Sequence, residues 1–576
     1  MTPLKRVWIP LAVVMLSYFV VILRLAHLQI FLHRPLSDKT SIEVTGRERV
    51  RPLRGRLLDH QGRVLATTLE RPSIFVNLRE TNVSPRQLAR ALAGALPGLR
   101  ASDFERRFAR ASNFVWIKRL SGDREVLAVR RLGLSGVGFF PEPQREYPAQ
   151  AADELLGRVN IDGDGSSGLE AKLNPLLQGR SEIRLVLKDA LGKVFAEREA
   201  PSGKFRMKAG ADGETGPFDV WLTIDGELQS RTQEHLDQAL RTQEAMAGAA
   251  IVMEVPTGAI LAMASKTQSW AKTSRRVGID PNLAASFTYE PGSVIKPFVI
   301  AAALANGVAR ESDTFDCEGG KYRPKPYLTI EDHEPYDILA LGQVLAYSSN
   351  IGMAKIGQLV GAQPFYSALR SFGFGSKTGL PVTGEAVGIV RSPEEWSGMS
   401  LTMMSFGYEI GVTPLQLTGA VAALGHDGVL LEPQIVARIS PWRGDRALYQ
   451  MTVRKVRRAV DAQVARRTVR MMREVMEYGT GKAGQIPGYP IAGKTGTAQK
   501  IDSATGKHST QHVVVTFCGL LPAPVPELAI CVLIDDARKP KVAWASDLAV
   551  PLFKKIAQEA IVILGIPPTE SAQAGV

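Results

Sequence analysis

A serine and a lysine three residues apart form the first pair in this chain whose types and spacing could do chemistry. Ser293 and Lys296 belong to the run Tyr-Glu-Pro-Gly-Ser-Val-Ile-Lys-Pro at residues 289–297. Side chains at i and i+3 share one helix face, so a helix that begins near Ser293 brings hydroxyl and amine together. Pro297 fits a first helical turn and excludes a helix interior. The pair predicts a nucleophile with its own base, where free N–H groups suit a developing oxyanion.

The same Ser-x-x-Lys spacing occurs a second time, at Ser269 and Lys272. That copy lies in a polar run at 265–276 without apolar periodicity, whereas Ser293 precedes the apolar run 298–304 and a stop at Asn306-Gly307. An apolar run that ends in glycine is typical of a buried helix. The local pattern therefore selects Ser293 as the candidate nucleophile.

Two further motifs follow in the chain. Ser348-Ser349-Asn350 comes after the apolar run 339–347, and Lys494-Thr495-Gly496-Thr497 lies in a strand-like segment at 489–498. A glycine inside a strand marks the close approach of a ligand or of another backbone. Lys-Thr-Gly also occurs at 377–379, after a glycine-rich stretch, and that copy is interpreted as a turn.

The elements around these motifs predict a mostly antiparallel sheet flanked by helices, in a domain that spans residues 216–566. A strand at 221–225 precedes a polar helix, and runs at 248–255 and 259–263 flank Pro256-Thr257-Gly258 as a hairpin. Further strand-like runs lie at 489–498, 513–519 and 528–534, after a mainly helical stretch. The sheet is therefore assembled from both ends of the domain.

Residues 40–215 mix short apolar alternations with turn signals and predict a β-rich module. One helical insertion is expected at 84–110, where Leu and Ala recur at helical spacing. The block 162–170 superficially resembles a calcium loop but lacks the full ligand spacing, which favours a glycine-rich structural turn. Residues 210–217 have the composition of a linker.

The N-terminus predicts a single membrane span. Residues 7–23 are free of charge and follow Lys5 and Arg6, which indicates entry from a positively charged cytoplasmic side. No small-x-small cleavage site follows, so an uncleaved anchor at 7–32 is favoured over a signal peptide. Residues 1–6 are then cytoplasmic, everything after the anchor lies outside the cytoplasm, and 567–576 form a C-terminal tail.

Composition narrows the class of protein. The chain has 576 residues and a net charge of +13, which favours anionic surroundings such as lipid headgroups. The arginine-rich stretch 454–473 lacks interleaved aromatics and is interpreted as the solvated side of a helix, so no nucleic-acid partner is expected.

The three cysteines have no metal-ligand spacing, and neither a metal nor a cofactor is expected. Cys518 and Cys531 flank a proline-rich turn; unbonded thiols are favoured over a disulfide, because cross-strand partners are often too far apart.

The three motifs together resemble the Ser-x-x-Lys, Ser-x-Asn, Lys-Thr-Gly signature of penicillin-binding proteins and class A β-lactamases. Likeness to class B penicillin-binding proteins covers nearly the whole chain, at 54–66, 145–148, 162–170, 222–225, 289–292 and 411–416. The resemblance implies an α/β (α+β) penicillin-binding transpeptidase domain at 216–566, after a pedestal at 40–215 like the family's dimerisation domain. His60 and Gln61 depart from the family's usual arginine-asparagine pair, which affects the pedestal alone.

The resemblance implies a D,D-transpeptidase that cross-links peptidoglycan stem peptides and is inhibited covalently by β-lactams. A stem ending in D-Ala-D-Ala acylates Ser293, releases D-alanine and passes to an amine of a neighbouring stem. Lys296 would be the acylation base, Ser348 would relay a proton to the leaving amine, and Asn350 would hold the substrate amide. A lysine serves as base only when burial or nearby cations lower its pKa, and Lys494 is such a cation.

The last motif implies the carboxylate and oxyanion sites. Lys494 would supply positive potential, and the Thr495-Gly496-Thr497 segment would bind the terminal carboxylate of the substrate through the two threonine hydroxyls. The implied oxyanion hole consists of the backbone N–H groups of Ser293 and Thr497.

The family likeness also implies a place in the cell. The sequence at residues 160–165 and the asparagine at position 350 are more similar to the cell-division transpeptidase than to the elongation enzyme. The elongation enzyme tends to carry aspartate at the position of Asn350. A septal enzyme of the bacterial cytoplasmic membrane is expected, with a membrane-embedded glycosyltransferase and other division proteins as partners.

Other classes of protein stay open at this point: an elongation-type transpeptidase, a membrane-anchored β-lactamase, and a non-catalytic penicillin sensor or division scaffold. A β-lactamase needs a carboxylate and a water for fast deacylation, and Glu385 and Glu409 are available glutamates. The sequence shows no glycosyltransferase signature, which argues against a bifunctional class A synthase.

Overall fold

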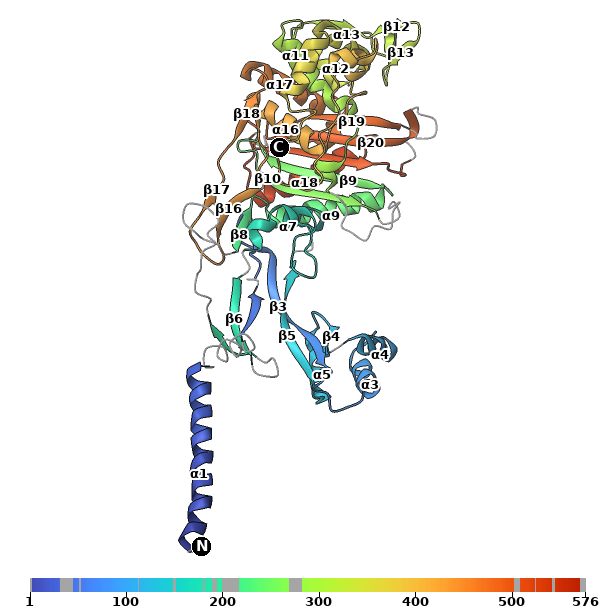
Figure 1. The fold of residues 1–576 in the computed structure, drawn as a ribbon. Helices are drawn as coiled ribbons and strands as arrows, with labels where there is room; N and C mark the ends of the chain where they lie inside the picture. The colour runs from blue at the N-terminus through green and yellow to red at the C-terminus, as the bar shows by residue number, and fades with distance from the viewer. Residues whose placement is uncertain are drawn as a thin grey trace. The chain divides into compact units, whose positions relative to one another are not determined.

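The computed structural model describes residues 3–31, 45–50, 53–111, 113–148, 152–179, 182–188, 194–198, 217–268, 282–501, 508–523, 525–540 and 544–569 (Figure 1). The chain divides into two units, residues 1–52 with 179–216, and residues 53–178 with 217–576. The second Ser-x-x-Lys pair at Ser269 and Lys272, most of the predicted linker and most of the predicted C-terminal tail lie outside the described residues.

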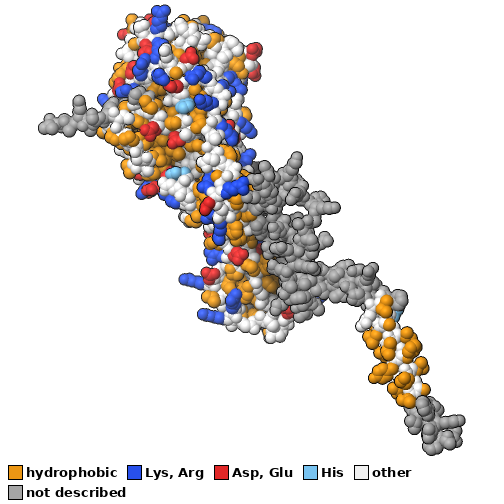
Figure 2. Space-filling model, turned by 90° about the vertical axis from the view of Figure 1, so that its left-hand side faces the viewer, with side chains coloured by type: hydrophobic (Ala, Val, Ile, Leu, Met, Phe, Trp, Pro, Cys, Tyr) orange, Lys and Arg blue, Asp and Glu red, His pale blue; other side chains and the backbone are white. Residues whose placement is uncertain are grey.

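The first unit holds the N-terminal helix and a small sheet. Helix α1 (Pro3–Ala26) continues as the π-helix η1 (His27–Phe31). The stretch Leu11–Ile30 has a mean hydropathy of 2.2, and among the described residues it is the one helical segment long and apolar enough to cross a membrane. Its apolar side chains are exposed along the helix (Figure 2), as the predicted anchor requires. Strands β1 (Thr45–Val50), β6 (Glu182–Lys188) and β7 (Val194–Arg198) pair in that order.

The central sheet of the second unit has five strands, all antiparallel, in the order β10-β9-β21-β20-β19. Strands β9 and β10 form the hairpin predicted around residues 256–258, and the other three come from the end of the chain, as the sequence predicts. The strands are β9 (Ala247–Glu254), β10 (Ile260–Thr267), β19 (Ala492–Ile501), β20 (His508–Leu521) and β21 (Leu528–Asp535).

Successive residues of the strands point to opposite sides of this sheet, and apolar side chains are buried on both sides. Helices therefore cover both faces. Helices α9 (Gly226–Thr242) and α18 (Ala549–Leu564) pack on one face, where Phe517 meets Phe553. The other face contributes to the larger core, together with helices α10 (Leu283–Ser286), α11 (Lys296–Ala305), α12 (Leu341–Ala346), α13 (Asn350–Val360), α14 (Ala362–Ser371), α15 (Ser400–Met404), α16 (Pro414–Gly425) and α17 (Ala462–Glu477).

A second sheet joins the predicted pedestal to the predicted transpeptidase domain. Its path is β17-β16-β8-β2-β3-β4, with β5 also paired to β3 (Figure 1). Strands from both predicted domains share the sheet, since β2 pairs in parallel with β8. The strands are β2 (Leu57–Leu58), β3 (Val64–Asn77), β4 (Phe114–Lys118), β5 (Val137–Glu146), β8 (Phe218–Leu222), β16 (Val436–Pro441) and β17 (Tyr449–Gln450).

Two predicted helical stretches differ from the structure. The insertion at 84–110 consists of two helices, α3 (Pro85–Ala95) and α4 (Ala101–Arg110), because Pro97 and Gly98 interrupt it and Gly98 adopts a positive φ of 83°. The arginine-rich stretch at 454–473 begins as a strand, β18 (Lys455–Arg458), paired with β15 (Val429–Leu431), and only its second part is helical.

The prediction of unbonded thiols at Cys518 and Cys531 is wrong, because these residues form a disulfide. They lie directly opposite each other on β20 and β21, with their Cα atoms 4.2 Å apart. Antiparallel strands alternate wide and narrow pairs, and the narrow pairs bring Cα atoms to about 4.5 Å. The sequence could not tell which kind of pair these cysteines occupy.

The glycine-rich block at 162–170 is a structural turn, as predicted. The Asn160 side chain accepts hydrogen bonds from the backbone N–H groups of Asp162 (3.0 Å) and Asp164 (2.9 Å). Glu170, at its end, is fully buried and accepts bonds from Arg54 Nε (2.6 Å) and Arg145 Nε (2.7 Å). Its carboxylate therefore joins two arginines of the pedestal.

Candidate active site

Ser293 stands at the start of the helix that the sequence predicts. A 3₁₀ turn, Gly292–Ile295, carries Ser293 and leads directly into α11, which has Pro297 in its first turn. Ser293 is half-buried and lines a cleft of about 620 Å³. The cleft also contains four other predicted site residues, namely Ser348, Asn350, Thr495 and Thr497.

Lys296 lies fully buried beneath this cleft. Its Nζ donates to the backbone oxygen of Ser348 (2.6 Å), to Ser348 Oγ (3.2 Å) and to Asn350 Oδ1 (2.8 Å). Burial lowers the pKa of Lys296 from its usual 10.5 to about 7, although the negative charge of Asp332 and the Cys317 thiol act in the opposite direction. Removing the amine from water disfavours its charged form, so a neutral amine is available near neutral pH.

Ser348 connects the two lysines of the site. Its Oγ accepts from Lys296 Nζ (3.2 Å) and from Lys494 Nζ (3.0 Å). Its backbone has a φ of +62°, in the left-handed region that residues other than glycine rarely occupy. Such conformations concentrate at functional sites. Here it lies at the junction of α12 and α13, where the hydroxyl meets both amines.

Lys494 comes from strand β19, at the edge of the central sheet. Besides Ser348 Oγ, its Nζ contacts the backbone oxygen of Thr495 (3.0 Å) and Thr495 Oγ1 (3.2 Å). Burial lowers the pKa of Lys494 well below its ordinary value, and the positive charge of Lys296 lowers that pKa further. Two buried amines that share one hydroxyl cannot both hold a proton cheaply, which favours proton transfer through Ser348.

Thr495, Gly496 and Thr497 follow Lys494 on β19, and the two threonines line the cleft. A Cβ on Gly496 would lie 2.8 Å from the backbone oxygen of Pro291 and 3.2 Å from the nitrogen of Val294, so glycine permits the strand to contact the Ser293 turn. Thr495 Oγ1 lies 2.6 Å from Thr480 Oγ1, and Thr497 Oγ1 accepts from the backbone nitrogen of Ala545 at 3.2 Å. Two hydroxyls thus flank the strand edge beside Lys494.

Asp332 is a site residue that the sequence reasoning missed. Its carboxylate accepts from the backbone N–H of Asn350 (2.5 Å) and from Ser349 Oγ (2.5 Å), at the start of α13. It therefore holds the Ser348-Ser349-Asn350 segment in place. Its negative charge also raises the pKa of Lys296, against the larger lowering by burial. Asp332 belongs to a polar stretch without a recognisable spacing to any motif, so the sequence offers no signal for it.

The cleft also has an aromatic wall that no motif indicates. The rings of Tyr336 and Tyr347 stack at 5.3 Å, and Tyr478 meets Tyr347 edge-on at 5.8 Å. His333 and Trp544 pack against each other at 4.5 Å on the same cleft. These side chains come from segments far apart in the chain, which explains why spacing rules do not detect them.

The remaining candidate residues lie elsewhere. The Lys-Thr-Gly copy at 377–379 is in a loop, as predicted, where the backbone N–H and the hydroxyl of Thr378 both donate to Glu385 Oε1 at 2.6 Å. Glu409 Oε2 accepts from Ser400 Oγ at 2.5 Å. Neither Glu385 nor Glu409 lines the cleft, so neither provides the carboxylate that a β-lactamase needs there.

Comparisons with known proteins agree with this architecture. Residues 248–558 match the family of penicillin-binding protein transpeptidase domains, and residues 49–212 match the penicillin-binding protein dimerisation domain. The chain is 30% identical over 575 residues to a probable peptidoglycan D,D-transpeptidase, PenA, of Neisseria meningitidis (99% of this chain, 94% of that protein). It is 28% identical over 549 residues to the peptidoglycan D,D-transpeptidase FtsI of Escherichia coli (92% and 86%).

Among solved structures, penicillin-binding protein 3 of Mycobacterium tuberculosis, complexed with ampicillin, superposes with a TM-score of 0.66 at 25% identity, over 91% of this chain and 98% of that one. The chain therefore belongs to the penicillin-binding protein transpeptidase family, with a dimerisation domain ahead of the catalytic one. The predicted family, fold class and enzyme class, a transpeptidase, are confirmed.

Proposed function

We propose that this chain is a peptidoglycan D,D-transpeptidase that forms its acyl-enzyme on Ser293. The observation that carries the proposal is the meeting of two buried amines, Lys296 and Lys494, at Ser348 Oγ, at 3.2 and 3.0 Å. A serine hydroxyl needs an adjacent base near neutral pH, and the neutral Lys296 supplies one. The family relationship assigns the donor substrate, a stem peptide that ends in D-Ala-D-Ala.

In the proposed reaction, Ser293 Oγ attacks the carbonyl carbon of the penultimate D-alanine while Lys296 takes the hydroxyl proton. The negative charge that develops on the carbonyl oxygen is stabilised by the backbone N–H groups of Ser293 and Thr497, an arrangement worth about 3–4 kcal/mol for each donor. The proton passes through Ser348 to the nitrogen of the departing D-alanine. The amine of a neighbouring stem peptide then attacks the ester and frees Ser293.

The remaining site residues orient the donor peptide. Asn350 lines the cleft, with its Oδ1 accepting from Lys296 and its Nδ2 donating to the backbone oxygen of Glu331, and it binds the peptide backbone of the stem. Thr495 and Thr497 bind the terminal carboxylate, and Lys494 provides the positive potential. Gly496 keeps the strand edge close to the Ser293 turn.

The domain division and the cellular place complete the proposal. Residues 7–32 anchor the chain in the cytoplasmic membrane, residues 40–215 form the pedestal, and residues 216–566 carry out catalysis outside the cytoplasm. The Cys518–Cys531 bond supports this topology, because disulfides persist in oxidising compartments.

Asn350 favours the septal enzyme over the elongation enzyme, with a membrane-embedded glycosyltransferase and other division proteins as partners. Depletion from growing cells should give filaments; rounded cells would assign the elongation role instead.

Labelled penicillin tests the chemistry. The intact chain should form a long-lived covalent adduct, Ser293→Ala should form none, and Ser269→Ala should form the adduct at the wild-type rate. Fast turnover of the adduct would indicate a β-lactamase. Absence of any adduct on the folded wild type would indicate a sensor or scaffold without catalysis.

A further inference from the structure

The disulfide lies in the same row of the central sheet as a catalytic lysine. Lys494 is directly opposite Cys518, which is directly opposite Cys531. Residues that face each other across antiparallel strands point to the same side of the sheet, with Cβ atoms about 4.5–5.5 Å apart. Both cysteines are at most 2% exposed and belong to the core on the α11 and α16 side. The sulfur atoms therefore lie beside the buried stem of Lys494.

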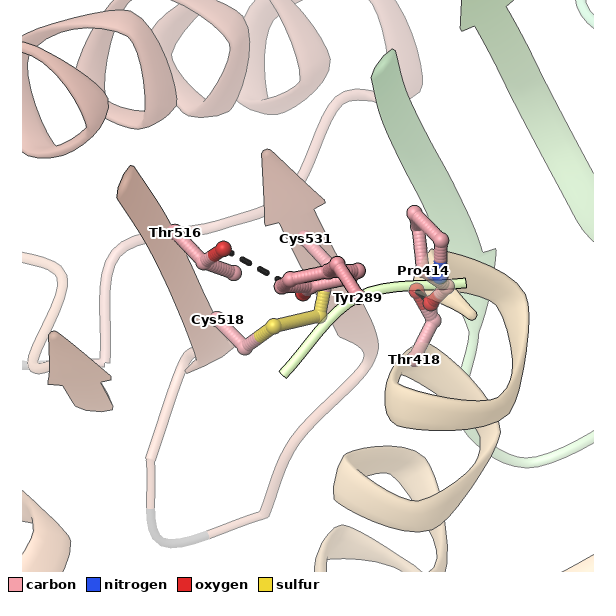
Figure 3. Close-up of a disulfide and its surroundings, with 6 residues drawn as sticks. All are labelled: Tyr289, Pro414, Thr418, Thr516, Cys518 and Cys531. Atoms are coloured by element: carbon pink, nitrogen blue, oxygen red, sulfur yellow. Dashed lines mark hydrogen bonds between the residues drawn. A yellow bond between two sulfur atoms is a disulfide. The ribbon is translucent and has the colours of Figure 1, made fainter. Parts of the chain in front are cut away.

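Tyr289 covers this disulfide. Figure 3 shows its ring between the two sulfur atoms and the start of helix α16, where Pro414 and Thr418 lie. Thr516 Oγ1, on the same face of β20 as Cys518, donates to Tyr289 Oη at 3.2 Å. The backbones of Tyr289 and Val412 exchange two hydrogen bonds, at 3.1 and 2.9 Å. The side chain of Tyr289 is thus fixed from the sheet, and its backbone from the segment before α16.

Only three residues separate Tyr289 from Ser293. Within them, the backbone nitrogen of Gly292 donates to the oxygen of Gly407 at 3.1 Å. Pro291 and Val294 pack against Gly496, which is directly opposite Thr516 in the sheet. The segment 289–294 therefore crosses from β20, where Tyr289 sits on the disulfide, to β19, where the Ser293 turn meets the edge of the sheet.

We propose that Tyr289, Thr516, Cys518 and Cys531 form a brace that positions Ser293 against Lys494 during acyl transfer, an inference that rests on the proposed function. Strands β20 and β21 are already paired along eight consecutive positions. The disulfide is therefore not needed to keep the two strands together. Its added effect is to fix the surface on which Tyr289 rests, one strand away from Lys494. These four are positioning residues, since they act on the reacting groups through the loop and the strand.

The first test removes the disulfide. Cys518→Ala with Cys531→Ala leaves a gap under Tyr289, and the first-order acylation step with labelled penicillin should slow by roughly 10-fold, less than the ~100-fold that a 1 Å misplacement can cost. The dissociation constant of the non-covalent complex should stay within about 2-fold, because a positioning defect acts on the chemical step.

A matched control separates positioning from general stability. Phe553 packs against Phe517 on the opposite face of the same sheet, in a different core cluster from Tyr289 and the two cysteines. Phe553→Leu should lower the melting temperature and leave the acylation step unchanged. If the double cysteine variant only loses melting temperature, and acylates at the wild-type rate below it, the brace is a stabilising feature and the proposal is wrong.

A second pair of variants covers the case in which the double cysteine variant does not fold. Thr516→Val removes the hydrogen bond to Tyr289 and should slow acylation about 3-fold, as expected for the loss of one hydrogen bond. Thr516→Ser, which keeps the hydroxyl, should acylate normally. Equal rates in both would overturn the proposal. Failure of the proposed function looks different, because the wild type would then form no Ser293-dependent adduct at all.

Discussion

Two clusters in the second unit bury ionisable side chains, and they stabilise them in different ways. In the pedestal, Glu170 is fully buried between Arg54 and Arg145, with bonds of 2.6 and 2.7 Å. In the cleft, Lys296 and Lys494 are just as buried, and the groups that they contact are oxygen atoms without charge. The charges in the pedestal cluster have partners of opposite sign, whereas burial lowers the pKa of both amines in the cleft. The first arrangement is suited to holding structure, and the second to moving a proton.

The most severe test of this comparison is Lys296→Ala. Loss of the base should slow acylation by labelled penicillin about 1000-fold, within the ~10²–10⁴-fold range of general-base catalysis. The fold should be retained, because Asp332, the negative charge that acts on Lys296, keeps its hydrogen bonds from Ser349 and Asn350 in the variant. Lys272→Ala, in the second Ser-x-x-Lys copy, is the control and should acylate normally. A loss of less than 10-fold for Lys296→Ala would contradict the role of the amine as base.

Glu170→Gln should have the opposite profile. It leaves two buried guanidinium groups without a counter-charge, which costs about 3–5 kcal/mol of unfolding free energy. Chemical denaturation should report this loss, while acylation of the folded fraction stays within 2-fold. A large change in acylation with unchanged stability would mean that the pedestal cluster acts on the chemistry.

The pH dependence of acylation should sharpen the distinction between the clusters. Lys296 is protonated below its pKa of about 7 and cannot then accept the proton of Ser293. The acylation rate should rise about 10-fold for each pH unit below this value and level off above it. In Glu170→Gln the profile should be unchanged, whereas a profile without a midpoint near 7 in the wild type would contradict the lowered pKa.

Stability should also depend on pH, with a sign that follows from the same shift. The pKa of Lys296 falls from 10.5 in the unfolded chain to about 7 in the fold, so the unfolded chain binds more protons between these values. The free energy of unfolding should therefore increase with pH across this window. Lys296→Met should weaken this increase, which denaturant titrations at pH 7 and pH 9 can measure.

The smallest expected effect comes from Asp332→Asn. The substitution keeps the shape of the cap at Asn350 and removes the negative charge that raises the pKa of Lys296. The midpoint of the acylation profile should move below 7, by roughly half a pH unit for a charge of this kind in a partly screened site. An upward shift would contradict the assigned interaction.

Much of this site follows from the sequence because its parts are local. The Ser293 turn, the junction of α12 and α13 and the strand of Lys494 each carry a motif of three or four consecutive residues. For the two motifs that occur twice, the surrounding pattern selects the copy that lies in the site. The hairpin and the returning strands follow from period-two patterns and turn residues.

The parts that the sequence did not predict depend on contacts between distant segments. Asp332 reaches Ser349 and Asn350 across 17 and 18 residues without a fixed motif. The positive φ of Ser348 is imposed by its surroundings and contradicts the local preference of serine. The disulfide required the register of β20 and β21, and in such sheets a shift of one residue moves side chains to the other face.

The most direct test of Ser293 as the nucleophile is to locate the penicillin adduct by mass spectrometry. The intact chain is acylated at pH 8, digested and mapped, with the acylation-deficient Ser293→Ala as reference. The added mass should appear on the peptide that contains residues 289–297 and on Ser293 within it. An adduct on any other serine, or one that persists in Ser293→Ala, would contradict the assignment of the nucleophile and with it the role of the two lysines.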